Sequence, residues 1–181
     1  FRFKKAAFTF IMVIMMVPTQ VSALGFVNLI TKMDLMDSLV PLFLPSIAAP
    51  AVFYFMYSYM QSSLPLELIE AARIDGSGEF HTFNKIVIPI MKPAMAVQAI
   101  FAFVQAWNNY FLPLIMLKDS NWYPLTIGLN QWKDQASTAG GQAIQNLVIT
   151  GSLITIIPLV IAFLCLQKYW QSGLAAGAVK E

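Results

Sequence analysis

Long stretches without a charged residue dominate the chain. Four such stretches, of 26, 29, 25 and 33 residues, cover positions 6–31, 38–66, 93–117 and 135–167. A helix needs about 20 mostly apolar residues to cross a bilayer, because its backbone groups must find hydrogen-bond partners within the segment. Each stretch therefore predicts one membrane-crossing helix, and we place the four crossings at residues 6–24, 39–60, 94–116 and 144–166.

The loop 61–93, between the second and third crossings, has a polar pattern of its own. It begins with two serines, a proline and an acidic residue, which is typical of a helix N-terminus. We predict a helix over residues 66–75 that ends at Gly76, because glycine tolerates the positive φ of a helix C-cap. A second short helix is predicted over residues 79–87, ending at Pro89.

The composition agrees with a membrane protein and excludes other classes. Of the 181 residues, 58% are hydrophobic and 11% are charged, whereas soluble domains have about 45–50% apolar and about 25% charged residues. Disorder requires the opposite balance, and a net charge of +2 gives no basis for nucleic-acid binding. We therefore expect an all-α membrane protein, a helical bundle with about four transmembrane helices, forming a single domain over residues 1–181.

Basic residues are distributed unevenly between the two sides of the predicted crossings. Eight of the 11 Lys and Arg residues fall on the side that holds both chain ends and loop 61–93, and three fall on the other side. Lys and Arg are enriched in cytoplasmic loops. Both ends of this chain and loop 61–93 are therefore predicted to be cytoplasmic, in a multi-pass protein of the plasma membrane.

Residues that could carry catalysis or bind metal are few. Cys165 is the one cysteine and His81 the one histidine, so the sequence offers no zinc-ligand cluster and no nucleophile with a histidine base inside a crossing. We assign no catalytic residue, no metal site and no cofactor to this chain, and we expect a protein that is not an enzyme.

The predicted helix 66–75 has a small apolar face with charged edges. Leu66, Ile69 and Ala72 follow i, i+3 spacing, and alanines permit another surface to approach closely. Seven of the chain's 20 charged residues lie in loop 61–93. Two interpretations remain open at this point: the helix docks on a partner, or it lies on the bundle or the lipid interface.

The same loop contains a longer pattern. The segment Glu70–Gly76 reads Glu-Ala-Ala-Arg-Ile-Asp-Gly and, after nine residues, is followed by Ile86-Val87-Ile88-Pro89. It resembles the EAA loop of the integral membrane permease subunits of bacterial ATP-binding-cassette importers, which reads Glu-Ala-Ala, three residues, Gly, nine residues, Ile, one residue, Leu-Pro. Ile88 in place of Leu is the one departure.

The resemblance extends to the rest of the chain. Trp107-Asn108-Asn109-Tyr110-Phe111-Leu112-Pro113 is similar to a Trp-Asn-Asp-Phe-like element of sugar permeases, and the end, 173–181, to the Gly-Ala-Val-Lys-Gly tail of the MalG-like carbohydrate subfamily. Asn109 stands where Asp is common, and Glu181 where Gly is usual. The resemblance implies a MetI-like permease fold with six crossings, so we expect this chain to be N-terminally truncated, with the first two helices missing.

The resemblance also implies partners and a function. The chain has no Gly-x-x-x-x-Gly-Lys-Ser/Thr loop for nucleotide phosphates, so ATP would be bound and hydrolysed by a separate ATP-binding-cassette ATPase dimer. Further expected partners are a second permease subunit, an external solute-binding protein and the lipid bilayer. In such permeases the EAA loop contacts the ATPase, and the residues implied for this contact are Glu70, Ala71, Ala72, Asp75 and Gly76.

A second candidate site lies at the end of the third predicted crossing. Gln98, Gln105 and Asn109 are seven and four residues apart and would share one helix face, with Trp107 and Asn108 close by. Amides bond sugar hydroxyls, and aromatic rings cover the apolar faces of sugars. We list Gln105, Trp107, Asn108 and Asn109 as candidates for the solute path. The alternative is that these residues tie membrane helices together.

Two other functional classes remain to be weighed. An ion-gradient-driven secondary carrier or channel usually holds ionisable residues inside the membrane, and the four predicted crossings contain none. A membrane-embedded enzyme would need the catalytic groups that are missing. The leading hypothesis is an importer permease that forms the solute pathway, with sugars as the expected solutes.

Overall fold

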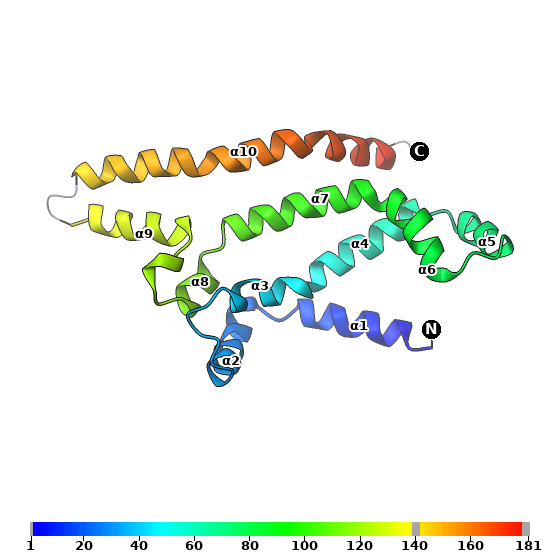
Figure 1. Ribbon diagram of the computed structural model, residues 1–181, viewed down its shortest axis with the longest axis horizontal. Helices are drawn as coiled ribbons and strands as arrows, with labels where there is room; N and C mark the ends of the chain where they lie inside the picture. The colour runs from blue at the N-terminus through cyan, green and yellow to red at the C-terminus, as the bar shows by residue number, and fades with distance from the viewer. Residues whose placement is uncertain (1, 139–141, 179–181) are drawn as a thin grey trace. The chain divides into compact units, whose positions relative to one another are not determined.

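Every regular element in the part of the chain that the structure describes is a helix. The computed structural model describes residues 2–138 and 142–178, and Figure 1 shows its helices in chain order from blue to red. The first half contains α1 (Lys4–Met15), α2 (Thr19–Lys32), α3 (Val40–Ile47), α4 (Pro50–Ser63), α5 (Leu66–Ile74) and α6 (Glu79–Thr82). The second half contains the π-helix η1 (Phe83–Val87), α7 (Ile88–Trp107), α8 (Phe111–Met116), the 3₁₀-helix η2 (Ser120–Trp122), α9 (Leu125–Ala136) and α10 (Gln142–Ala178).

Within residues 2–138 and 142–178, three helical segments are long and apolar enough to cross a membrane. They run over Val40–Ser63, Glu79–Trp107 and Ile144–Cys165. A bent pair, Lys4–Met15 with Thr19–Lys32, brings the number to four if it is counted as one span. The second and fourth expected crossings, 39–60 and 144–166, lie close to the observed segments.

The first expected crossing, 6–24, differs from the structure. Two helices meet there at an angle of 96° instead of one straight helix. The break lies at Pro18, whose φ of −61° and ψ of 133° are extended. Proline lacks a backbone N–H and pushes the preceding residue away from helical geometry. The chain therefore ends one helix before Pro18 and starts another at Thr19.

The third expected crossing, 94–116, is displaced in the structure. The short helix expected over 79–87 does not end at Pro89, because α6, η1 and α7 follow one another without a gap up to Trp107. The π-helix η1 ends at Val87, two residues before Pro89, and π-turns occur mostly as single turns within longer helices. Residues 111–116 form the separate helix α8.

The described chain divides into two compact units by its internal contacts, and the single permease domain expected over 1–181 stays a prediction. One unit combines residues 1–50 with 105–160, and the other combines 51–104 with 161–181. In the first unit, α8 contacts both α2 and α3, and its largest fully buried side chains are Ile30, Met116, Ile127 and Pro41.

The core of the second unit joins its span to the polar loop. Val87, Met91 and Ala94 are buried together. Partly buried side chains of α4, of the α4–α5 connection and of α5 pack against them: Phe55, Met56, Tyr59, Met60, Leu64 and Ile69. The loop helix α5 is therefore anchored on the spans through Leu64 and Ile69.

Candidate functional site

The helix α5 begins at the predicted residue, Leu66, and ends close to the predicted boundary. Its N-cap, Pro65, is extended, and Glu67 lies in the first turn, while Arg73 lies in the last turn. Acidic residues at a helix N-terminus and basic residues at its C-terminus complement the helix dipole. The helix ends at Ile74, one residue before the predicted boundary.

A Schellman motif ends α5. The N–H of Gly76 donates to the carbonyl of Arg73 (3.0 Å), and the N–H of Ser77 donates to the carbonyl of Ala72 (2.9 Å). Gly76 occupies the C′ position with a φ of +77°, which is the left-handed conformation that this motif requires. The expectation that Gly76 ends the helix is therefore confirmed, with a defined hydrogen-bond pattern.

Side chains close the turn that follows. The Arg73 guanidinium donates to Glu79 Oε1 through both Nε (2.9 Å) and Nη2 (2.8 Å). The hydroxyls of Ser77 and Thr82 lie 2.9 Å apart, and Thr82 is buried. Because the ion pair is exposed, it contributes only about 0–1 kcal/mol. Its geometric effect is to connect the end of α5 to the start of α6.

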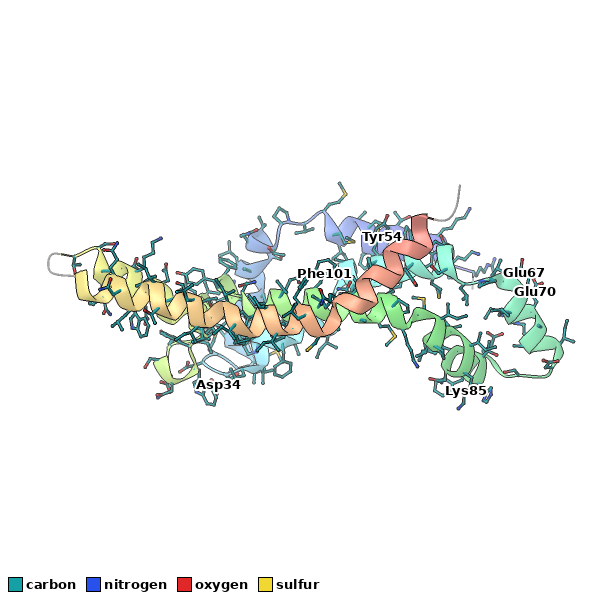
Figure 2. All side chains as sticks on the ribbon, turned by 90° about the horizontal axis from the view of Figure 1, so that it is seen from above. Asp34, Tyr54, Glu67, Glu70, Lys85 and Phe101 are labelled. Carbon is teal, nitrogen blue, oxygen red and sulfur yellow. The ribbon has the colours of Figure 1, made fainter. Side chains whose placement is uncertain are left out.

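The five candidate contact residues do not share one environment. Glu70, Ala71, Asp75 and Gly76 are exposed, whereas Ala72 is only 7% exposed. Four of the five are therefore accessible to a partner, and the Ala72 side chain instead lies within the chain's own packing. Figure 2 places Glu67 and Glu70 on α5, and Lys85 on the separate α6–η1 segment.

Large apolar residues of the same loop are exposed; Leu66 and Ile74 belong to or adjoin the apolar face predicted for the helix, whereas Phe80 was not singled out from the sequence. Leu66, Ile74 and Phe80 are 69%, 86% and 82% exposed. Large apolar side chains grouped on a surface often mark a binding site. The Arg73–Glu79 pair was also missed, although two opposite charges on either side of Gly76 and Gly78 are a usable signal for a closed turn.

The candidate solute-path residues lie around the end of α7. Gln105 and Asn108 are exposed. Trp107 donates from Nε1 to the backbone carbonyl of Thr155 in α10 (3.1 Å), and the carbonyl of Asn109 accepts from the Thr126 hydroxyl (2.8 Å). These bonds tie α7 and the segment after it to neighbouring helices, which is the alternative role considered for the polar residues.

Asn109 does not share a helix face with Gln98 and Gln105. The expected shared face of Gln98, Gln105 and Asn109 requires one helix through all three positions. Because α7 ends at Trp107, Asn109 lies beyond the helix and is not held to its face. Within the described residues, no three His, Cys, Asp or Glu side chains are grouped so that they could hold a metal ion.

Comparisons with known proteins place these features in a family. A family model described as "Binding-protein-dependent transport system inner membrane component" matches residues 1–175. The arabinooligosaccharides transport system permease protein AraQ of Bacillus subtilis is 37% identical over 180 residues, which cover 99% of this chain and 62% of AraQ. The melibiose/raffinose/stachyose import permease protein MelC of Bacillus subtilis is 33% identical, over 99% of this chain and 64% of MelC.

A solved structure has a similar fold. It is a crystal structure of a bacterial ABC transporter involved in the import of the acidic polysaccharide alginate, with a TM-score of 0.80 and 22% sequence identity. The match covers 93% of this chain and 62% of that chain. The chain thus has the all-α fold of an importer permease, and it spans less than two thirds of the length of AraQ and MelC.

The apolar helices and the family description together indicate a multi-pass protein of the bacterial inner membrane. The match over residues 1–175 leaves only the last six positions outside the family model. The chain therefore belongs to the family of binding-protein-dependent transport system inner membrane components.

Proposed function

We propose that this chain acts in the permease subunit of an ATP-driven importer, forms part of the solute pathway and couples to a separate ATPase. The observation that carries the proposal is the geometry of α5 and its turn. A short helix is held on the spans by Leu64 and Ile69 and ends in a fixed left-handed turn at Gly76. Glu70, Ala71 and Asp75 remain exposed on it.

This geometry suits transmission of force from a partner. Glu70 and Asp75 would serve as polar anchors, while Ile74 and Phe80, both more than 80% exposed, would enter apolar recesses on the ATPase dimer. Because α6, η1 and α7 are consecutive, a displacement of the loop would be passed directly to a membrane span. Closure of the ATPase would in this way change the access of the solute pathway.

The proposed solutes are carbohydrates. The names of the relatives AraQ and MelC refer to oligosaccharides. Gln105, Asn108, Asn109 and Trp107, at and just beyond the end of α7, provide amides and an aromatic ring that suit sugar hydroxyls and sugar faces. A second permease subunit and an external solute-binding protein complete the proposed assembly, with ATP bound by the ATPase alone and loop 61–93 in the cytoplasm.

The turn at Gly76 provides the test. Gly76→Pro cannot adopt a φ of +77° and removes the N–H that donates to Arg73. We expect the full-length permease with Gly76→Pro, reconstituted with its ATPase in proteoliposomes, to keep ATP hydrolysis but to lose uptake about tenfold or more. A proline at an incompatible backbone position destabilises the native conformation by more than about 1 kcal/mol, and here that conformation is the turn that ends α5.

Gly78→Pro is the matched control, because the φ of Gly78 is −72° and suits proline. Uptake should be near the wild-type level in that variant. Wild-type uptake by Gly76→Pro at normal expression would refute the coupling role. Uptake that persists without ATP but collapses with an ionophore would instead indicate an ion-driven carrier.

A further inference from the structure

A recess of about 350 Å³ lies between α9 and α10, beside the segment that follows α7. Figure 1 shows α9 running alongside the first part of α10. All of its lining residues belong to one compact unit. Five of them are polar and two are apolar: Tyr110, Thr126, Asn130, Lys133 and Ser152, with Leu129 and Val148.

Specific contacts hold the walls in place. Thr126 donates its hydroxyl to the carbonyl of Asn109 (2.8 Å), which fixes the start of α9. Asn130 Nδ2 donates to the hydroxyl of Tyr110 (2.9 Å) across the recess wall. At Gly151, an added Cβ would lie only 2.8 Å from Leu129 Cδ2, so α10 approaches α9 closely at this point.

The polar groups keep hydrogen-bonding capacity for a ligand. The Tyr110 hydroxyl accepts from Asn130, which leaves its own proton to donate. The Ser152 hydroxyl donates to the carbonyl of Val148 (2.7 Å) and can still accept. The side-chain carbonyl of Asn130 provides a further acceptor. Such a mixture of donors and acceptors suits a molecule with several hydroxyls.

Lys133 adds a charge to this set. It is exposed at the recess, and the lining includes no Asp or Glu. Among the described residues, no ion pair involves Lys133. An ammonium next to neutral hydroxyls and an amide favours a carboxylate or phosphate group on the ligand. The recess is open on one side, and most of the surface that its lining presents is apolar, so the few polar groups and Lys133 would fix the orientation of a bound molecule.

We propose that this recess is a binding site for a hydroxyl-rich molecule that carries one anionic group, such as a sugar acid or a sugar phosphate, with Lys133 as the residue that selects the charge. The inference rests on the proposed function in taking the ligand to be a transported solute. The same chemistry is found in the headgroup of phosphatidylglycerol, so the experiment separates the two sources.

The test measures binding directly. The purified full-length permease, in phosphatidylcholine nanodiscs, is titrated with glucuronate, glucose 6-phosphate and glucose by saturation-transfer NMR. We expect the two anionic sugars to bind more tightly than glucose. Lys133→Met should weaken the anionic sugars about tenfold, since hydrogen bonds to charged groups contribute about 1.5–3 kcal/mol. Lys133→Arg should retain binding, and Tyr110→Phe should weaken all three sugars.

Lys32→Met is the matched control, because Lys32 is an exposed lysine in the last turn of α2, outside the recess. A second set of nanodiscs contains phosphatidylglycerol. If Lys133→Met changes lipid retention there and leaves sugar binding untouched, the ligand is the headgroup and not a solute. Equal binding of glucose and glucuronate, or no effect of Lys133→Met in either arm, overturns the proposal and leaves Lys133 as a charge at the C-terminus of α9.

The binding result is independent of the importer proposal. ATP-dependent uptake by a Lys133→Met variant that no longer binds the anionic sugars would leave the proposed function intact while removing the recess from the solute route. A permease that binds them through Lys133 but shows no ATP-dependent uptake would contradict the proposed function and keep the site.

Discussion

At the scale of single residues, three positions in the described part of the chain adopt left-handed backbone conformations, each for an identifiable reason. Gly76 and Asp34 both occupy the C′ position of a Schellman motif. In the second motif, the N–H of Asp34 donates to the carbonyl of Thr31, and the N–H of the next residue donates to the carbonyl of Ile30. Asp37 is different, because its φ of +59° is accompanied by side-chain bonds to a distant segment. Asp and Gly tolerate such conformations better than most residues.

Asp37 fastens the α2–α3 connection to the segment after α8. Its Oδ1 accepts from the backbone N–H of Lys118 (2.8 Å) and of Asp119 (2.9 Å), and its own N–H donates to the carbonyl of Met116 (2.9 Å). The N–H groups of Asp119 and then Lys118 hold the pKa of this carboxyl below its ordinary value. No feature of the sequence indicated this contact, because the partners are about 80 residues apart.

The lowered pKa predicts a pH dependence of stability. Because the folded form favours the carboxylate, the stabilisation is complete above the ordinary aspartate pKa of about 3.9 and is lost as the pH falls through the lowered pKa of the folded state. Asp37→Asn keeps the acceptor oxygen and tolerates positive φ, but it does not titrate. We therefore expect the difference in Tm between the wild type and Asp37→Asn to be constant from neutral pH to about 5 and to shrink in acid.

The measurement is thermal unfolding in detergent micelles across that pH range, with Asp37→Ala added to remove the acceptor. Asp37→Ala should be less stable than Asp37→Asn at neutral pH. A Tm difference between the wild type and Asp37→Asn that does not change on acidification would contradict the role given to the Asp37 carboxylate.

At the scale of elements, close packing and proline geometry shape the helices. The approach of α9 to α10 depends on Gly151, where an added Cβ would lie 2.8 Å from Leu129 Cδ2 and 3.3 Å from Trp132 Cζ3. Gly25, in the exposed face of α2, has no atom within 4 Å of such a Cβ. A side chain at position 151 would therefore clash with α9, whereas a side chain at position 25 would not meet another atom.

Gly151→Val should destabilise the contact between α9 and α10. Overpacking of a tight site costs about 1–3 kcal/mol, because the Leu129 and Trp132 side chains would have to move. We expect a lower Tm and faster hydrogen exchange in α9, measured by mass spectrometry. Gly25→Val is the control and should leave α9 unchanged. Equal protection of α9 in both variants would count against the role of Gly151.

The elements also show what could be predicted from the chain and what could not. The positions of α5 and of the Gly76 turn follow from local signals, namely the early proline, the dipole-compatible charges and the glycine. Pro18 and Pro89 carry the same local signal, yet one breaks a helix by 96° and the other lies inside a continuous span. Pro93 and Pro158 also lie inside helices, so the presence of a proline does not by itself predict a break.

Some features of the α5 loop could be predicted from the local sequence, and others could not. The exposed positions of Glu70, Ala71 and Asp75 follow from the helical period and the charged edge. The burial of Ala72 depends on packing within the chain, and the turn closure by Arg73 and Glu79 depends on side chains that meet only after the turn has formed. Local sequence patterns do not encode the burial of Ala72 or the contact between Arg73 and Glu79, because both depend on how the folded chain packs.

At the scale of the whole molecule, large apolar side chains remain exposed along the described spans. Only 6%, 22% and 0% of the three membrane-span windows are buried within the chain. Such surfaces can contact lipid tails or other apolar helices, because the backbone N–H and C=O groups are hydrogen-bonded within each helix. This agrees with membership in a family of inner membrane transport components.

Binding of an ATPase by the α5 loop, as proposed above, is measured most directly by co-purification. Glu70 lies exposed on α5, and Asp134 is also an exposed acid, on α9. We predict that tagged full-length permease from membranes retains an ATPase, that Asp134→Lys retains as much, and that Glu70→Lys retains about tenfold less, because like-charge or unpaired contacts at an interface cost several kcal/mol. Retention of the ATPase by Glu70→Lys at the wild-type level, or ATP-independent uptake by a permease that retains no ATPase, would contradict the account.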